Sequence, residues 1–177
     1  MICEQSALAI TEWAPRLIPD IVRAPGYARA LLFPRVSDPE VLDRLMFAHL
    51  SRANVLTPEA RRPDRYTLLL STAALKFPAA EATDMLEQLY LLRAVSKQSR
   101  VDLRLVPEDD CPPDLFGACA VYKVDGDRSV PALPQLDTTI YLSKAADVAH
   151  HQATHKFACR EGARQAAIAR RHCHRDR

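Results

Sequence analysis

The sequence has 177 residues, of which 48% are hydrophobic and 26% are charged. These proportions are typical of a soluble globular protein, and the length suits one domain with a hydrophobic core but is short for two. Because 24 basic residues nearly balance 22 acidic ones, for a net charge of +2, the composition argues against a nucleic-acid-binding protein and against a partner of anionic membranes.

The N-terminus and the cysteines indicate a cytoplasmic location. Residues 1–10 contain Glu4 and no basic segment, so they do not resemble a signal peptide, and no apolar run is long enough to cross a membrane. Five cysteines at irregular spacings are expected to be thiols in a reducing compartment rather than a disulfide framework.

The first half of the chain predicts short helices and one buried strand. Prolines divide residues 13–34 into short helical pieces, and Pro25 suits the start of the second. A helix is expected from Ser37, as its N-cap, along the apolar period of residues 41–50. Residues 57–65 contain two prolines and five charges and predict a loop, whereas the apolar run at residues 66–70 predicts a buried strand.

The second half predicts another helix, three strands and a long final helix. Residues 79–95 follow a helical period, and short strands are expected at residues 101–106, 118–124 and 138–142. Residues 144–171 contain no proline and predict a long helix from about residue 145, with residues 172–177 as a tail. The expected fold is a single α+β domain over residues 1–177, with a small four-stranded sheet packed against helices and a long C-terminal helix.

Six segments in order resemble the C-terminal domain of WhiJ-like (antitoxin-like) helix-turn-helix regulators of actinomycetes. The resemblance extends from about residue 10 to residue 170. Each segment is short, and their order and spacing carry the resemblance. The segments are EWAPRLIPDIVRAPGYARALL at residues 12–32, a helix over residues 41–56 that ends in RANVLT, TLLLSTAALKFP at residues 67–78, DMLEQLYLL, VDLRLVP and IYLSKAADVA.

The resemblance implies a domain that usually follows a helix-turn-helix and senses a small ligand or a partner protein. Only about ten residues precede the matching region in this sequence, which is too few for a helix-turn-helix. We therefore expect no direct binding to DNA. The expected partners are a small-molecule ligand or substrate, a regulator protein, or a second copy of the chain, and not a membrane.

The sequence departs from the family pattern at positions that could carry chemistry. Ser71, Thr72 and Ser143 stand where acidic residues are usual in the family. His151 and His155 stand where the last helix usually has Tyr and Phe, at positions that face the core. An imidazole at such a position needs a hydrogen-bond partner or a metal, because burying it unpaired is costly.

His151, His155 and Cys159 are the candidate cofactor-binding residues. Their i, i+4, i+8 spacing places them on one face of a helix, and His151 and His155 alone could bind a metal ion. The three positions extend about 12 Å along a helix, too far for one ion, so haem is the preferred cofactor, with another transition metal, or no ligand, as alternatives.

Two functional hypotheses follow. The first is a regulator-like domain repurposed to bind haem or a metal, which could act as an oxidative enzyme of specialised metabolism. The second is a regulatory domain that does not bind DNA and that binds a small ligand or a partner protein. The sequence contains no GxSxG, P-loop or GxGxxG motif, so it identifies no catalytic residue.

Overall fold

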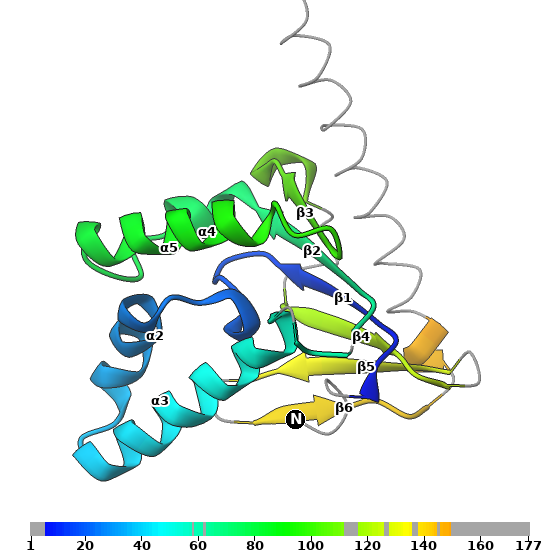
Figure 1. Ribbon diagram of the computed structural model, residues 1–177, viewed down its shortest axis with the longest axis horizontal. Coiled ribbons are helices and arrows are strands. Elements are labelled where there is room, and N and C mark those ends of the chain that lie inside the picture. Colours follow the sequence, from blue (N-terminus) through cyan, green and yellow to red (C-terminus); the bar gives the residue numbers. More distant parts are fainter. Residues whose placement is uncertain are drawn as a thin grey trace, which may run out of the picture.

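The computed structural model describes residues 6–57, 59–61, 63–111, 117–125, 128–135, 138–144 and 146–149. Its frame is a six-stranded mixed sheet (Figure 1), in which the strand order is β3-β2-β1-β4-β5-β6. The strands are β1 (Ala9–Ala14), β2 (Arg65–Ser71), β3 (Val101–Val106), β4 (Cys119–Lys123), β5 (Ser129–Pro134) and β6 (Thr139–Tyr141).

The expectation of a small four-stranded sheet is wrong. Four of the strands correspond to expected ones, but β1 and β5 were not predicted. Glu12 interrupts the apolar pattern of β1, which lies in the middle of the sheet, and two prolines, Pro131 and Pro134, obscure β5. Of the long C-terminal helix expected from about residue 145, residues 146–149 are helical, and the rest lies outside the described residues.

The sheet changes direction at β1. The neighbours β1, β2 and β3 are parallel, whereas β4, β5 and β6 continue from β1 as antiparallel strands. In the register, Trp13 lies opposite Leu69 on one side and Cys119 on the other. The carboxyl ends of the three parallel strands therefore share one edge of the sheet with the start of β4 and the end of β5.

The helices α2 (Pro25–Leu32), α3 (Pro39–Ala53) and α5 (Ala82–Val95) lie on one side of the sheet (Figure 1). The short helix α4 (Thr72–Lys76) follows β2, and single 3-10 turns occur at η1 (Asp20–Val22), η2 (Phe33–Arg35), η3 (Asn54–Leu56) and η4 (Glu108–Asp110). Pro25 occupies the first position of α2, as expected. Asp38, not Ser37, caps α3, because its carboxylate accepts hydrogen bonds from the backbone N–H groups of Glu40 and Val41.

The main hydrophobic core lies between the sheet and this helical layer. Alternate residues of β1 and β2, such as Ile10 and Leu68, point into it and are fully buried. Each such side chain stabilises the fold by about 1.5–3 kcal/mol. The buried apolar residues of α3, Leu42 and Met46, belong instead to a small separate cluster with α2. Within the described part of the chain, no helix has the length and apolar character needed to cross a membrane.

Candidate ligand-binding site

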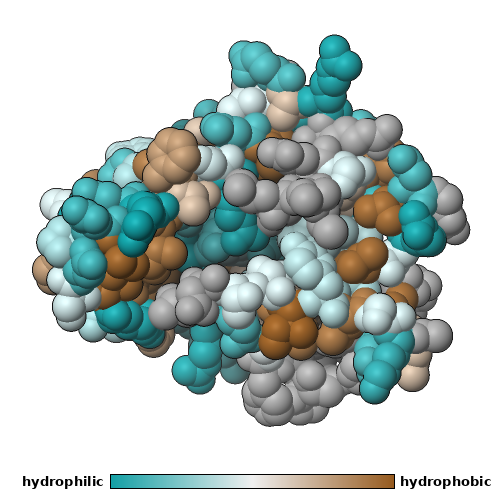
Figure 2. Space-filling model, turned by 90° about the horizontal axis from the view of Figure 1, so that it is seen from below, coloured by the Kyte–Doolittle hydropathy of each residue, from teal (hydrophilic) through white to brown (hydrophobic). Residues whose placement is uncertain are grey.

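Two adjoining hollows open at the edge of the sheet where β1 ends. The smaller has a volume of about 150 Å³ and the larger about 290 Å³. Seen from below, the surface is hollowed between the helical side of the molecule and the sheet, and hydrophilic residues form much of its wall (Figure 2). Four residues line both hollows, which makes them one site: Asp20, Arg23, Arg52 and Gln135.

Position in the fold explains why a hollow forms here. Ligands of open sheets bind beyond the carboxyl ends of strands, where neighbouring connections leave in different directions. The chain leaves β1 toward η1 and α2 on the helical side, whereas β4, on the other side of β1, starts at this edge. Two small residues line the larger hollow at this edge: Ala14, the last residue of β1, and Ala118, which precedes β4.

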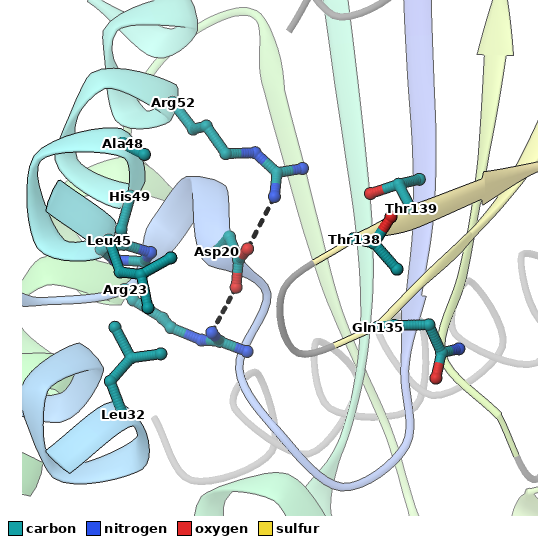
Figure 3. A pocket seen from close by; sticks show the side chains of 10 residues that line it. All are labelled: Asp20, Arg23, Leu32, Leu45, Ala48, His49, Arg52, Gln135, Thr138 and Thr139. Atoms are coloured by element: carbon teal, nitrogen blue, oxygen red, sulfur yellow. Dashed lines mark hydrogen bonds and ion pairs between the residues drawn. The ribbon is translucent and has the colours of Figure 1, made fainter. Parts of the chain in front are cut away.

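An ion cluster of Arg23, Asp20 and Arg52 lies between the two hollows. The Asp20 carboxylate pairs with Arg23 one turn later in the chain, and its Oδ2 lies 2.6 Å from Nη1 of Arg52 on α3 (Figure 3). The three side chains are 16–23% exposed, so they are partly withdrawn from water. A carboxylate held between two guanidinium groups in this setting joins η1 to α3 through charge-assisted hydrogen bonds.

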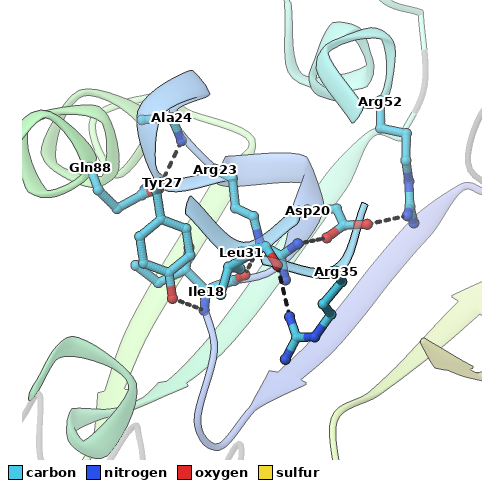
Figure 4. A network of polar contacts seen from close by, with 9 residues as sticks. All are labelled: Ile18, Asp20, Arg23, Ala24, Tyr27, Leu31, Arg35, Arg52 and Gln88. Atoms are coloured by element: carbon cyan, nitrogen blue, oxygen red, sulfur yellow. Dashed lines mark hydrogen bonds and ion pairs between the residues drawn. The ribbon is translucent and has the colours of Figure 1, made fainter. Parts of the chain in front are cut away.

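Buried hydrogen bonds fix the segment that carries Asp20 and Arg23. Gln88 of α5 is fully buried; its Oε1 accepts from the backbone N–H of Ala24 at 2.7 Å, and its Nε2 donates to the carbonyl of Val22 at 2.8 Å. Arg23 Nε donates to the carbonyl of Ile18 at 2.5 Å (Figure 4). The charged groups are therefore placed on a rigid turn, as a preorganised binding site requires.

Arg35 is a third arginine at the larger hollow. It ends η2, and its Nη1 donates to the carbonyl of Leu31 at 2.8 Å (Figure 4). Among the described residues, no carboxylate forms an ion pair with Arg35. A guanidinium has five N–H donors, so a single carbonyl leaves most of this group available at the hollow.

Glu12 is a buried carboxylate at the larger hollow. It is 7% exposed, and it accepts a 2.7 Å hydrogen bond from the hydroxyl of Tyr66 on the neighbouring strand. Burial, followed by the charge of Glu12, raises the pKa of Tyr66 well above its usual value, so the phenol stays protonated. Burial and the same carboxylate raise the pKa of Cys119 to about 12, which makes this thiol unreactive at neutral pH.

His49 of α3 lines the smaller hollow. The residue is 7% exposed, and its Nε2 has no hydrogen-bond partner among the described residues. Burial lowers its pKa, although the nearby charge of Asp20 opposes the effect, so the imidazole is neutral at pH 7. A buried ring nitrogen without a partner is costly, and a ligand atom that reached it would remove that cost.

The residues predicted from the sequence do not form this site. His151, His155 and Cys159 lie outside the described residues. Ser71 and Thr72 have structural roles: Ser71 caps α4 by accepting from the N–H of Ala73, and Thr72 accepts from the N–H of Glu108. Among the described residues, no three or more His, Cys, Asp or Glu side chains are grouped as a metal site would require.

Sequence reasoning missed the arginines, although one indication was present. The buried period of α3 runs through Leu42, Met46 and His49, and Arg52 continues it. A charged residue at a core-facing position indicates a buried ion pair or a functional group. No comparable indication identified Arg35, which follows the end of α2.

Comparison with known proteins gives one match. The model of a family described as a domain of unknown function (DUF5753) matches residues 1–173. No curated protein and no solved structure matches the chain.

Proposed function

We propose that this chain, which belongs to the DUF5753 family, is a regulatory domain that binds a small molecule in the two adjoining hollows at the carboxyl end of β1. The observation that carries the proposal is the partly buried cluster of Arg23, Asp20 and Arg52, which both hollows share. The resemblance of the sequence to the sensing domain of WhiJ-like regulators supports the same role.

The composition of the larger hollow suits a ligand. Sites for small molecules are mostly apolar, with a few converging polar groups that fix the orientation of the ligand. Leu17, Pro19 and Leu31 provide apolar wall, and the arginines, Glu12 and Gln135 provide the polar groups. Stability alone gives little reason for this arrangement, because well-packed apolar residues often stabilise a fold as well as buried ion pairs do.

The attachment of α3 gives binding a way to act on the rest of the molecule. The buried apolar residues of α3, Leu42 and Met46, cluster with α2, and Arg52 of the same helix pairs with Asp20 in η1. A ligand at the ion cluster would contact α3 and the sheet edge together. If the ligand bound more tightly to one position of α3 than to another, binding would increase the population of that position. A sensing domain can pass on ligand binding by such a change in conformation.

The haem or metal hypothesis depends on His151, His155 and Cys159, which lie outside the described residues. No contact of a described residue bears on it. Binding of haem or a metal by these residues is a prediction separate from ligand binding in the hollows.

A screen of small acids, amines and neutral compounds by thermal unfolding tests the proposal. A compound at 100 times its Kd should stabilise the protein by about 2.7 kcal/mol. Ala48→Trp, at the exposed rim of the smaller hollow, and Ala118→Trp, at the larger one, should weaken binding by obstruction. Ala94→Trp on the exposed side of α5 is the matched control. A compound that binds both rim variants as it binds the original protein would place its site elsewhere.

A further inference from the structure

We infer that the ligand is a carboxylic acid with a single negative charge and an apolar body of about the size of a bicyclic ring, with its carboxylate at Arg35 and the adjoining arginines. This inference rests on the proposed function, since it assigns a chemical class to the ligand of the same hollows. Arg35 carries the assignment, because its guanidinium faces the larger hollow and is held by the Leu31 carbonyl rather than by a carboxylate.

The balance of charge favours a monoanion. Among the described residues that line the hollows, three arginines face two carboxylates, Glu12 and Asp20. Asp20 is shared between Arg23 and Arg52, and the histidine in the wall is neutral at pH 7. One positive charge is therefore in excess. A ligand with one negative charge neutralises this excess positive charge. A phosphate monoester carries a charge of about −1.5 to −2 at pH 7 and would leave part of its negative charge without a partner.

The geometry of a guanidinium suits a carboxylate. Its planar fork of N–H groups forms two parallel hydrogen bonds with the two oxygens of a carboxylate. The Leu31 carbonyl restrains the Arg35 side chain before a ligand arrives, which lowers the conformational entropy lost on binding. Arg35 is an exposed residue, and this hydrogen bond restrains its guanidinium beside the larger hollow.

The apolar wall of the larger hollow favours a ligand whose uncharged part is apolar. Ala14, Leu17, Pro19, Leu31 and Pro134 line the larger hollow and offer no side-chain hydrogen-bond donor. A cavity of about 150 Å³ accepts benzene, so a volume of about 290 Å³ has room for roughly two fused rings. A small hydrophilic acid would leave this apolar wall in contact with water.

The smaller hollow adds a place for one neutral polar group. His49 lines this hollow and has a buried Nε2 with no partner among the described residues, and Thr138 and Thr139 bring hydroxyl groups from the start of β6 (Figure 3). Since both hollows meet at the ion cluster, a hydroxyl or amide on the same acid could reach this wall.

Matched acid and amide probes test the inference. Phenylacetate and indole-3-acetate are compared with phenylacetamide and indole-3-acetamide, and with inorganic phosphate, by ligand-observed NMR at millimolar concentration. Each titration is repeated with Arg35→Gln, Arg35→Lys and Arg29→Gln. Arg29 is the control because it is an exposed arginine of α2 that does not line either hollow.

We expect the acids to bind and the amides to bind at least about tenfold more weakly, since a charge-assisted hydrogen bond is lost. We expect Arg35→Gln to weaken the acids by a similar factor, Arg35→Lys to retain part of the affinity, and Arg29→Gln to have no effect. The inference is overturned if amides or phosphate bind as well as the acids, or if Arg35→Gln changes nothing. Binding by the amides alone would still support a small-molecule site, whereas no binding by any probe or by any compound of the wider screen would contradict the proposed function itself.

Discussion

Asp20 and Arg52 are 32 residues apart in sequence, and their side chains meet at 2.6 Å between the turn after β1 and helix α3. This pair connects the sheet edge to a helix whose buried apolar residues, Leu42 and Met46, cluster with α2 rather than with the main core. It is therefore both a structural link and part of the wall that a ligand would touch, and the two roles can be separated by experiment.

Removing Asp20 should destabilise the fold more than breaking an exposed ion pair does. Asp20→Ala leaves the Arg23 and Arg52 guanidinium groups close together without their shared carboxylate, and we expect the free energy of unfolding to fall by about 1–3 kcal/mol. Lys76→Ala, which breaks the exposed pair with Glu108, should cost less than about 1 kcal/mol. Urea denaturation measures both, and equal losses would show that the Asp20 cluster contributes no more than a surface pair.

Tyr66 should make stability fall at alkaline pH. Its folded-state pKa is raised, so the unfolded chain loses this proton near pH 10 while the folded protein keeps it. The resulting stability is complete below pH 10 and is lost as the pH rises further. Tyr66→Phe should lower stability at pH 7 by about 1–3 kcal/mol, because the buried Glu12 carboxylate loses the hydrogen bond from this hydroxyl, and should reduce the alkaline slope. Tyr90→Phe, at an exposed position, should do neither.

His49 should make stability fall at acidic pH, whereas Tyr66 makes it fall at alkaline pH. Burial lowers its folded-state pKa, so the unfolded chain takes up a proton near pH 6.5 before the folded protein does. Stability is therefore lost as the pH falls below about 6.5. His49→Leu should be less sensitive to pH between 7 and 5 in urea denaturation, and an unchanged slope would show that His49 does not titrate as its burial predicts.

The regular elements were largely predictable from local patterns, and the exceptions have physical causes. Strands β2 and β3 are apolar or alternating runs, and they lie where the sequence predicts them. β1 was missed because Glu12 occupies an inward position, where its carboxylate accepts a hydrogen bond from the hydroxyl of Tyr66 on another strand. β5 was missed because Pro131 cannot donate a ladder hydrogen bond, although its carbonyl still accepts one from Leu142.

The candidate site was less predictable than the fold. Arg52 could have been found from its place in the buried period of α3. The contact between Arg52 and Asp20, and the hollow that Arg35 faces, depend on how β1, α3 and η2 come together. Local patterns in one sequence do not predict such contacts between distant segments.

The cofactor hypothesis has its own test. If His151 or His155 binds haem, the purified protein, expressed with ample haem precursor, should have a Soret absorption band. His151→Ala and His155→Ala, made separately, should abolish bound iron in at least one case, and Cys159→Ser should release the cofactor or change its affinity. Protein that contains neither haem nor a stoichiometric metal ion would reject this hypothesis.

The most direct test of a ligand site at the hollows is an NMR titration that observes the arginine Nε–Hε groups. The titrant is the tightest-binding acid among the probes. We predict that the resonances of Arg35 and of at least one of Arg23 and Arg52 shift in proportion to occupancy. The resonances of Arg29 and Arg93, which are exposed and do not line the hollows, should stay unchanged. Shifts confined to Arg29 and Arg93, or no shift at any arginine at millimolar acid, would contradict binding of the acid in the hollows.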